Sequence, residues 1–194
     1  MPTGIALRDV REQLFAAAER VLRDHGPNAL TSRAVTDEAG CAKGVLHRHF
    51  TDFDGFLAEL VLRRIGRVDD QAEALRARVG EGSIADNLLD VLVDVFDPIA
   101  LAAVALTITR DGMRTKLREA GVAGIPVLTE SVAMITDYLT LERDHGRLPA
   151  SVEPDLIALT MIGTAQLIFT APDESVDERA ALRRTVVAAL PSGS

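Results

Sequence analysis

The chain of 194 residues carries a net charge of −8, and 47% of its residues are hydrophobic but only 4% aromatic. Such a chain can bury one or two modest cores built mainly from Ala, Leu, Val and Ile, a composition that favours closely packed helices. The single cysteine, Cys41, excludes an intrachain disulfide and a zinc site built from cysteines. We interpret Cys41 as a core residue, with a redox sensor as the alternative.

The first predicted element is a helix over residues 7–25, because apolar residues recur along one face of it and Gly26-Pro27 ends it sharply. A short second helix follows in residues 31–40. Thr31 or Ser32 can cap its first turn with a side-chain oxygen, and a glycine ends it.

A third short helix is predicted to open at Lys43 and to turn Leu46 and Phe50, four residues apart, toward the core. The residues left outside are cations and a glycine: Lys43, Gly44, His47 and Arg48. Two short helices with this polarity suit insertion into a DNA major groove. The spacing alone is only suggestive, because helix-turn-helix pairs also occur in purely structural roles.

The rest of the chain also shows helical periodicity, and the fold class is therefore all-α. The predicted helices cover about residues 53–78, 84–96, 98–110, 126–145, 154–169 and 176–190. Asp97-Pro98 predicts a helix start, since it places a cap before a proline at the first helical position. These helices divide the chain into an N-terminal part over residues 7–52 and a larger helical part over 53–190.

The negative charge lies outside the predicted DNA-binding segment. Residues 1–64 contain nine Lys or Arg and nine Asp or Glu, whereas residues 65–194 contain twelve basic and twenty acidic residues. The DNA-facing end is thus nearly neutral and avoids most of the repulsion from phosphates. Contacts with the DNA backbone must then come from a few well-placed groups rather than from a broad basic patch.

Over about residues 8–65 the chain resembles the DNA-binding domain of the TetR family of bacterial transcriptional regulators. The family motif reads roughly T-x-x-x-I-A-x-x-A-G-V-S-x-G-T-L-Y-x-Y-F, followed by a polar turn and a long helix. The matching residues here are Thr31, Val35, Ala39, Gly40, Lys43, Gly44, Leu46 and Phe50, then Thr51, Asp52, Phe56 and Leu57. The resemblance implies a double-stranded DNA operator as partner.

The resemblance implies DNA contacts from both motif helices, at Thr31, Ser32, Arg33, Lys43, Gly44, Val45, His47, Arg48 and His49. Three positions depart from the family pattern: Val45 replaces a threonine, His47 a tyrosine, and Phe53 a common lysine. Val45 loses a hydroxyl but can touch a thymine methyl, and His47 can still donate to a phosphate. Arg33 matches a position that reaches a base or phosphate in related regulators; a solvated surface arginine is the alternative.

The resemblance also implies a small-molecule effector and a homodimer, with a DNA-binding domain over residues 7–52 and a helical ligand-binding and dimerisation domain over 53–190. The candidate effector residues are Phe96, Thr107, Met113, Met134 and Tyr138, each of which has ordinary core packing as its alternative. The last two helices carry more apolar residues than one buried stripe needs, which predicts a dimer interface at Leu156, Leu159, Gly163, Leu167, Leu182 and Val186. The alternative is a monomer whose terminal helices cap the core.

Together these features predict a ligand-responsive transcriptional repressor that binds a pseudo-palindromic operator as a dimer and is released by a small apolar effector. The alternative is a helical small-molecule-binding protein that has lost DNA binding. We expect no enzymatic activity, cofactor or metal, since none of the common catalytic or nucleotide-binding motifs occurs. The apolar run 99–108 is too short to span a bilayer, which needs about 20 residues, and no targeting segment is visible, so we expect a cytoplasmic protein without a membrane partner.

Overall fold

The computed structural model describes residues 4–170 and 177–191, which form ten α-helices and one 3₁₀ turn and contain no strand. The elements are α1 (Gly4–His25), η1 (Pro27–Ala29), α2 (Ser32–Glu38), α3 (Val45–His49), α4 (Phe53–Arg76), α5 (Ile84–Val95), α6 (Pro98–Thr109), α7 (Asp111–Glu119), α8 (Leu128–Asp144), α9 (Pro154–Thr170) and α10 (Glu178–Ala189). The predicted all-α fold class is confirmed.

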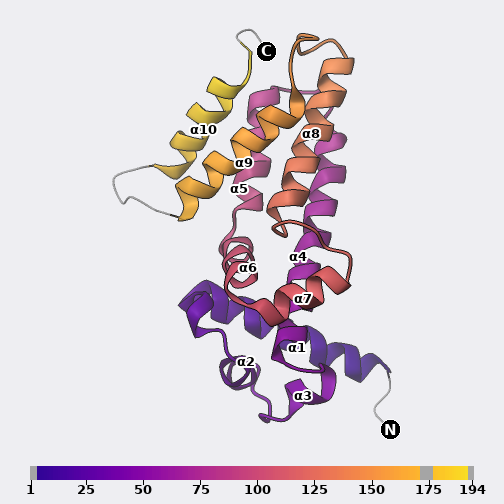
Figure 1. Cartoon of the computed structure of the whole chain (residues 1–194), viewed down its shortest axis with the longest axis vertical. Helices are drawn as coiled ribbons and strands as arrows, with labels where there is room; N and C mark the ends of the chain where they lie inside the picture. The colour runs from indigo at the N-terminus through magenta and orange to yellow at the C-terminus, as the bar shows by residue number, and fades with distance from the viewer. Residues whose placement is uncertain (1–3, 171–176, 192–194) are drawn as a thin grey trace.

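The helices form a small N-terminal cluster and a longer body. Helices α1, α2 and α3 gather at one end, and α4 leads from them into the body, where α5, α8, α9 and α10 lie (Figure 1). In the body, α8 packs on α4 and α9, while α10 packs on α5 and α9. The short helices α6 and α7 lie between the two parts, since α6 contacts α1 and α7 contacts α4.

Several helices begin at a side chain that accepts a hydrogen bond from the backbone N–H three residues later. These caps are Thr31, Asp52, Ser83, Asp97 and Asp177. Each cap of this kind stabilises its helix by about 1 kcal/mol. The predicted starts at Thr31 and Asp97-Pro98 are confirmed.

Some predicted boundaries were wrong. The recognition helix begins at Val45 rather than Lys43, because residues 43 and 44 form a turn in which the Val45 N–H donates to the Ala42 carbonyl at 2.9 Å. Helix α7 was not predicted, since its nine residues are strongly polar and bury only Met113 and Leu117. The predicted start of the last helix at Val176 lies outside the described residues.

The core of the N-terminal cluster is aromatic and includes the first turns of α4. The ring of Phe15 stacks on Phe56 at 5.2 Å between centroids and meets Phe50 edge-on at 5.4 Å. Phe56 therefore packs with α1 and the end of the motif, although it lies beyond residue 52. The division into domains at 52 and 53 stays a prediction, and the shared rings couple α4 to the motif.

Two buried charged residues tie the body together. Arg64 of α4 is 2% exposed, and its Nη2 donates to the carbonyls of Asp94 and Val95 at 3.1 and 3.0 Å. Burial lowers the pKa of this guanidinium, which lies 3.5 Å from the carboxylate of Asp97. The fully buried Glu142 of α8 lies 3.3 Å from Arg147 and accepts the Gly80 N–H. Arg64 thus holds α4 against the corner between α5 and α6.

Within residues 4–170 and 177–191, no single helix is long and apolar enough to cross a bilayer. Helices α5 and α6 would meet the criterion only as a pair, by length and composition, and they are bent by 61° at the break between them.

Candidate functional site

The first motif helix presents one predicted contact residue fully to solvent. Arg33 has a side chain that is 74% exposed, and its Nε lies 3.4 Å from the Asp37 carboxylate one turn later. Thr31 uses its hydroxyl to cap α2, accepting from the Ala34 N–H at 3.0 Å. Ser32 is half-buried at the start of the helix. Arg33 is therefore free to reach DNA, apart from one exposed ion pair.

The recognition helix α3 and the turn before it expose one polar edge. Lys43, Gly44, His47 and Arg48 are exposed, whereas Leu46 and Phe50 are buried, as the spacing of the apolar residues predicts. Val45 and His49 are half-buried, so they are less open to a ligand than the other predicted contact residues. This edge can donate hydrogen bonds to base edges and phosphates.

Arg11 of α1 is a residue of this site that the sequence did not reveal. Its Nη1 donates to the His49 carbonyl at 2.7 Å, and its guanidinium lies 4.2 Å from the centre of the Phe50 ring. The second terminal nitrogen of Arg11, Nη2, forms an ion pair with Glu59 of α4. Arg11 thus fixes the C-terminal end of α3 against both neighbours, a role that only the fold makes visible.

A joint of charged residues connects the start of α4 to α7. Lys116 Nζ lies 3.1 Å from the Asp52 carboxylate, and Arg110 Nη2 lies 2.7 Å from that of Asp54. The pKa of Asp52 is lowered, chiefly by the N–H of Gly55 and then by the hydrogen bond from Lys116. The Arg110 guanidinium also lies 5.5 Å from the ring centre of Phe53, the residue that replaces the family lysine.

This joint, formed by Asp52, Phe53, Asp54, Arg110 and Lys116, is also sterically tight. A Cβ added at Gly112 would overlap the carboxylate of Asp54. Helix α7 can therefore approach α4 this closely only because position 112 has no side chain. The N-terminal cluster and the body meet here through specific charges and little free space.

The five candidate effector residues are all buried, but they do not gather around one cavity. Phe96 stacks on Phe169 at 5.4 Å, and the Tyr138 hydroxyl accepts from Asn87 Nδ2 at 3.0 Å. Burial raises the pKa of that phenol. Met113 and Met134 pack in the core. Thr107 alone of the five lines one of the cavities described below.

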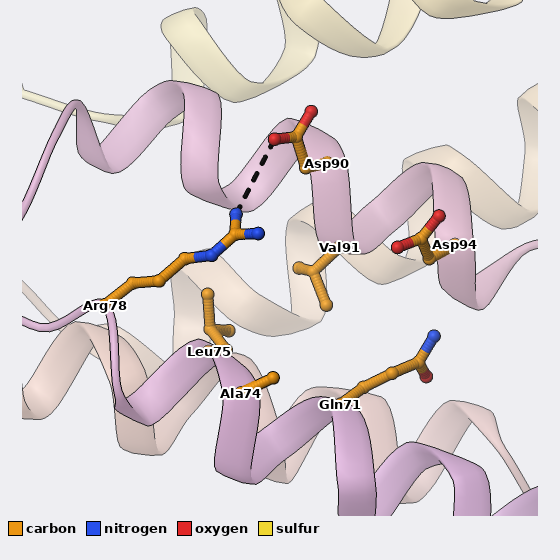
Figure 2. A pocket seen from close by; sticks show the side chains of 7 residues that line it. All are labelled: Gln71, Ala74, Leu75, Arg78, Asp90, Val91 and Asp94. Carbon is orange, nitrogen blue, oxygen red and sulfur yellow. Dashed lines mark ion pairs between the residues drawn. The ribbon is translucent and has the colours of Figure 1, made fainter.

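A cavity between α4 and α5 is too small for an effector. It measures about 60 Å³ and is crossed by Arg78, whose guanidinium lies 3.6 Å from the carboxylate of Asp90 (Figure 2). A water molecule takes about 30 Å³ of liquid volume, so this space suits one or two waters. Gln71 lines it and has a buried Oε1 without a partner among the described residues, which such a water would satisfy.

A larger cavity of about 500 Å³ lies where α6, α7 and the loop between α7 and α8 meet. Its lining includes Thr107 of α6, Arg114, Leu117 and Arg118 of α7, and Val122 and Pro126 of the loop. Pockets for small ligands typically measure about 300–1,000 Å³. By size, this space can accept an effector.

The outer face of α9 is apolar and uncovered. Leu156, Leu159 and Leu167 are 55%, 60% and 72% exposed, and Gly163 on the same face is exposed as well. Val187 of α10 adds a fifth position at 58%. An uncovered apolar stripe of this kind marks an interaction surface.

Two of the residues predicted for a dimer interface cannot belong to one. Leu182 and Val186 are both fully buried within the protomer. They form the inner face of α10, which packs on α5 and α9, so no surface of theirs remains for a partner. The sequence pattern predicts a dimer interface at these apolar residues of the last helix, but the chain buries them against its own helices.

Residues 14–60 match the family described as "Bacterial regulatory proteins, tetR family". This segment runs from α1 through the motif into the first turns of α4. The N-terminal part of the chain therefore carries the DNA-binding domain of the TetR family. Members of this family are DNA-binding transcriptional regulators and not enzymes.

Solved structures of TetR-like proteins share the fold over nearly the whole chain. The reduced form of NemR from E. coli has a TM-score of 0.73 at 18% identity, covering 96% of this chain and 99% of that one. A putative TetR-family regulator from Mesorhizobium loti has a TM-score of 0.68 at 17% identity, covering 94% of both chains. SmeT, the repressor of the Stenotrophomonas maltophilia multidrug efflux pump SmeDEF, has a TM-score of 0.65 at 18% identity, covering 94% of this chain and 91% of that one. No curated protein matches the chain in sequence.

Proposed function

We propose that this TetR-family protein is a cytoplasmic, homodimeric repressor that binds a pseudo-palindromic operator and is released by a small effector with an apolar body. The observation that carries the proposal is the pairing of two exposed surfaces on one chain. One is the polar edge of α3, and the other is the uncovered apolar face of α9 and α10 at the far end of the body.

The apolar face supports the dimer. Leu156, Leu159, Gly163, Leu167 and Val187 present a stripe that a second copy of the chain can cover about a two-fold axis. If the two-fold axis runs along the body, such an isologous interface places the two identical recognition helices on one side of the assembly. Dimeric helix-turn-helix proteins read half-sites about 34–36 Å apart, so the operator should be an inverted repeat.

Repression and release need two states of the dimer with different spacing of the recognition helices. Helix α4 is the candidate lever, because it runs from the DNA-binding end at Phe53 past Val68 into the body. An effector that moves the population from 1:99 to 99:1 must favour the released state by about 5.5 kcal/mol. That SmeT is named as the repressor of an efflux pump supports repression as the direction of control.

The test starts from a pool of random DNA duplexes, since the operator sequence is unknown. Repeated selection with the purified protein should enrich an inverted repeat. Sedimentation should show a species of twice 20.8 kDa for the protein alone, and that mass plus one duplex for the complex. Failure to enrich any sequence would instead favour the helical binding protein that has lost DNA binding. Placing the selected repeat in a promoter then distinguishes repression from activation.

A further inference from the structure

The chemistry of the 500 Å³ cavity indicates more about the effector than its size does. Six large apolar side chains are exposed among the described residues. Four of them, on α9 and α10, belong to the proposed dimer face. The other two are Ile108, 58% exposed, and Ile125, 41% exposed, and they neighbour the cavity residues Thr107 and Pro126 in sequence.

Two cations line the same cavity from one helix. Arg114 and Arg118 are four residues apart on α7, so their side chains lie on one face of that helix, where two like charges repel each other. Arg114 forms an ion pair with Asp111 in the first turn of the helix. Arg118 has no ion-pair partner among the side chains that the structure describes, those of residues 10–170 and 177–191, so its charge is available to a ligand.

The rest of the lining is apolar or small. Leu117, Val122 and Pro126 supply hydrocarbon surface, and no acidic residue lines the cavity. The hydroxyl of Thr107 already donates to the Ala103 carbonyl at 2.8 Å, so it offers a ligand only its remaining lone pair and its methyl group. The cavity therefore combines an apolar wall with positive charge along one side.

The loop that closes the cavity holds a strained residue. Val127 has φ of 72°, a left-handed conformation that β-branched residues rarely adopt. Its N–H donates to Glu130 Oε2 at 2.7 Å and its carbonyl accepts from Ser131 Oγ at 2.6 Å, which hold the backbone in place. The conformation persists because these hydrogen bonds hold it, and a ligand that displaced the loop would relieve the strain.

We propose that this cavity takes an amphipathic anion, with an apolar body against Leu117, Val122 and Pro126 and a single carboxylate at Arg118 and Arg114. This inference rests on the proposed function for the identity of the site as the effector site. It replaces a purely apolar effector with one that carries an anionic group.

Helix α7 also gives such a ligand a direct route to the DNA-binding end. Arg114 and Arg118 line the cavity, while Gly112 and Lys116 face the start of α4 in the charged joint. A shift of this nine-residue helix toward the ligand must alter its contact with Asp52 and Asp54. The ligand thereby acts on α4 without occupying the core of the body.

The binding test uses decanoate, with 1-decanol as the neutral probe of equal chain length and acetate as the head group alone, all below micellar concentration. Isothermal titration of the full-length dimer should show decanoate binding more tightly than 1-decanol and acetate not binding. Arg118→Gln should weaken decanoate about five- to tenfold and leave 1-decanol unchanged. Arg23→Gln, which removes an exposed arginine on α1 that does not line the cavity, is the matched control.

A second variant tests the place of binding. Ala123 is an exposed residue of the cavity lining, so Ala123→Trp should fill the cavity without disturbing the core and abolish binding of both long-chain probes. Equal affinity for decanoate and 1-decanol, or an Arg118→Gln protein that binds decanoate as the wild type does, would overturn the anionic assignment. No binding of either probe to the wild type would overturn the site.

The DNA readout separates this proposal from the proposed function. Decanoate that binds with the expected arginine dependence but leaves the affinity for the selected inverted repeat unchanged supports the site and refutes release through it. If no repeat is selected from the DNA pool, the proposed function as a DNA-binding regulator is wrong. The titration then still decides whether the cavity binds an amphipathic anion.

Discussion

The DNA-binding end and the body are both helical, but different side chains hold them together. Four of the six phenylalanines of the chain lie within residues 15–56, where their rings pack on one another. The body relies on aliphatic residues, and α9 buries Ala158, Met161 and Ala165. A few aromatic contacts, each adding roughly 0.5–1.5 kcal/mol beyond burial, specify the first region, whereas many small contacts specify the second.

The two regions also differ in what they leave uncovered. The DNA-binding end exposes polar and cationic groups on α3, and the body exposes an apolar stripe on α9. Substitutions should accordingly have separable effects: on folding inside the body, on association at its outer face, and on DNA affinity at the motif. The four predictions below test this separation.

The largest effect is expected for Leu182→Ala on the inner face of α10. Because Leu182 is fully buried, the cavity left behind should lower the free energy of unfolding by about 2–5 kcal/mol, measured by urea denaturation. Val187→Ala, on the exposed face of the same helix, is the matched control and should change protomer stability little. A Leu182→Ala protein that stays fully stable yet becomes monomeric would restore this residue to the dimer interface.

The next effect is expected at the outer face of α9. Leu159→Asp would bury an unpaired carboxylate in the proposed interface, which should weaken dimerisation by about 3 kcal/mol or more, over 100-fold in the dissociation constant. Sedimentation equilibrium should show a 20.8 kDa protomer with unchanged helix content by circular dichroism. Ala77→Asp, at an exposed position after α4, is the control, and an intact Leu159→Asp dimer would place the interface elsewhere.

Smaller and more selective effects are expected in the motif. Lys43→Ala and Arg33→Ala should each cost about 1–3 kcal/mol on the selected operator and little on scrambled duplexes, because these exposed side chains are proposed to reach base edges. His47→Ala should weaken binding to both duplexes about equally, as expected for a phosphate contact. Titrations at two salt concentrations measure this difference, and equal losses on both duplexes for Lys43→Ala would remove its role in sequence recognition.

The smallest effect concerns Asp52 at the joint. The pKa of Asp52 is lowered in the folded protein, so its contribution to stability is present above the unfolded pKa of 3.8 and is lost as pH falls through the folded value. Asp52→Asn keeps a capping side chain but loses the ion pair with Lys116, which should cost a few tenths of a kcal/mol near neutral pH and flatten the stability curve below about pH 4.

Asp52→Ala is the companion variant, since it removes the cap as well and should cost about 1 kcal/mol. Thermal unfolding across pH 3–7 compares the two variants. Identical curves for wild type and Asp52→Asn would show that Lys116 contributes nothing measurable at this position.

The parts of the molecule that the sequence predicted well are those encoded locally. The spacing of Leu46 and Phe50 and the caps at Thr31 and Asp97 act within one or two helical turns, so they can be recognised without the fold. Family resemblance added the identity of the motif, because its matching residues fall within the segment 14–60.

The parts that were missed depend on contacts distant in sequence. Arg11 reaches residues 38 and 48 positions away, and the partner of Asp54 at the joint is Arg110. Leu182 was wrongly assigned to the dimer interface for a related reason. Apolar periodicity shows that a face is buried, but it does not show whether the partner is the same chain or a second copy.

The joint between α4 and α7 makes ionic strength act on this regulator at two places. Added salt reduces the free energy gained by releasing counterions from DNA, and it also screens the half-buried ion pairs of Asp52 with Lys116 and of Asp54 with Arg110. The second effect loosens the support of the recognition helices without touching a phosphate. The slope of the logarithm of operator affinity against the logarithm of salt concentration will therefore be steeper than the phosphate contacts alone would give. The excess will vanish when both partners of each ion pair in the joint are replaced by neutral residues.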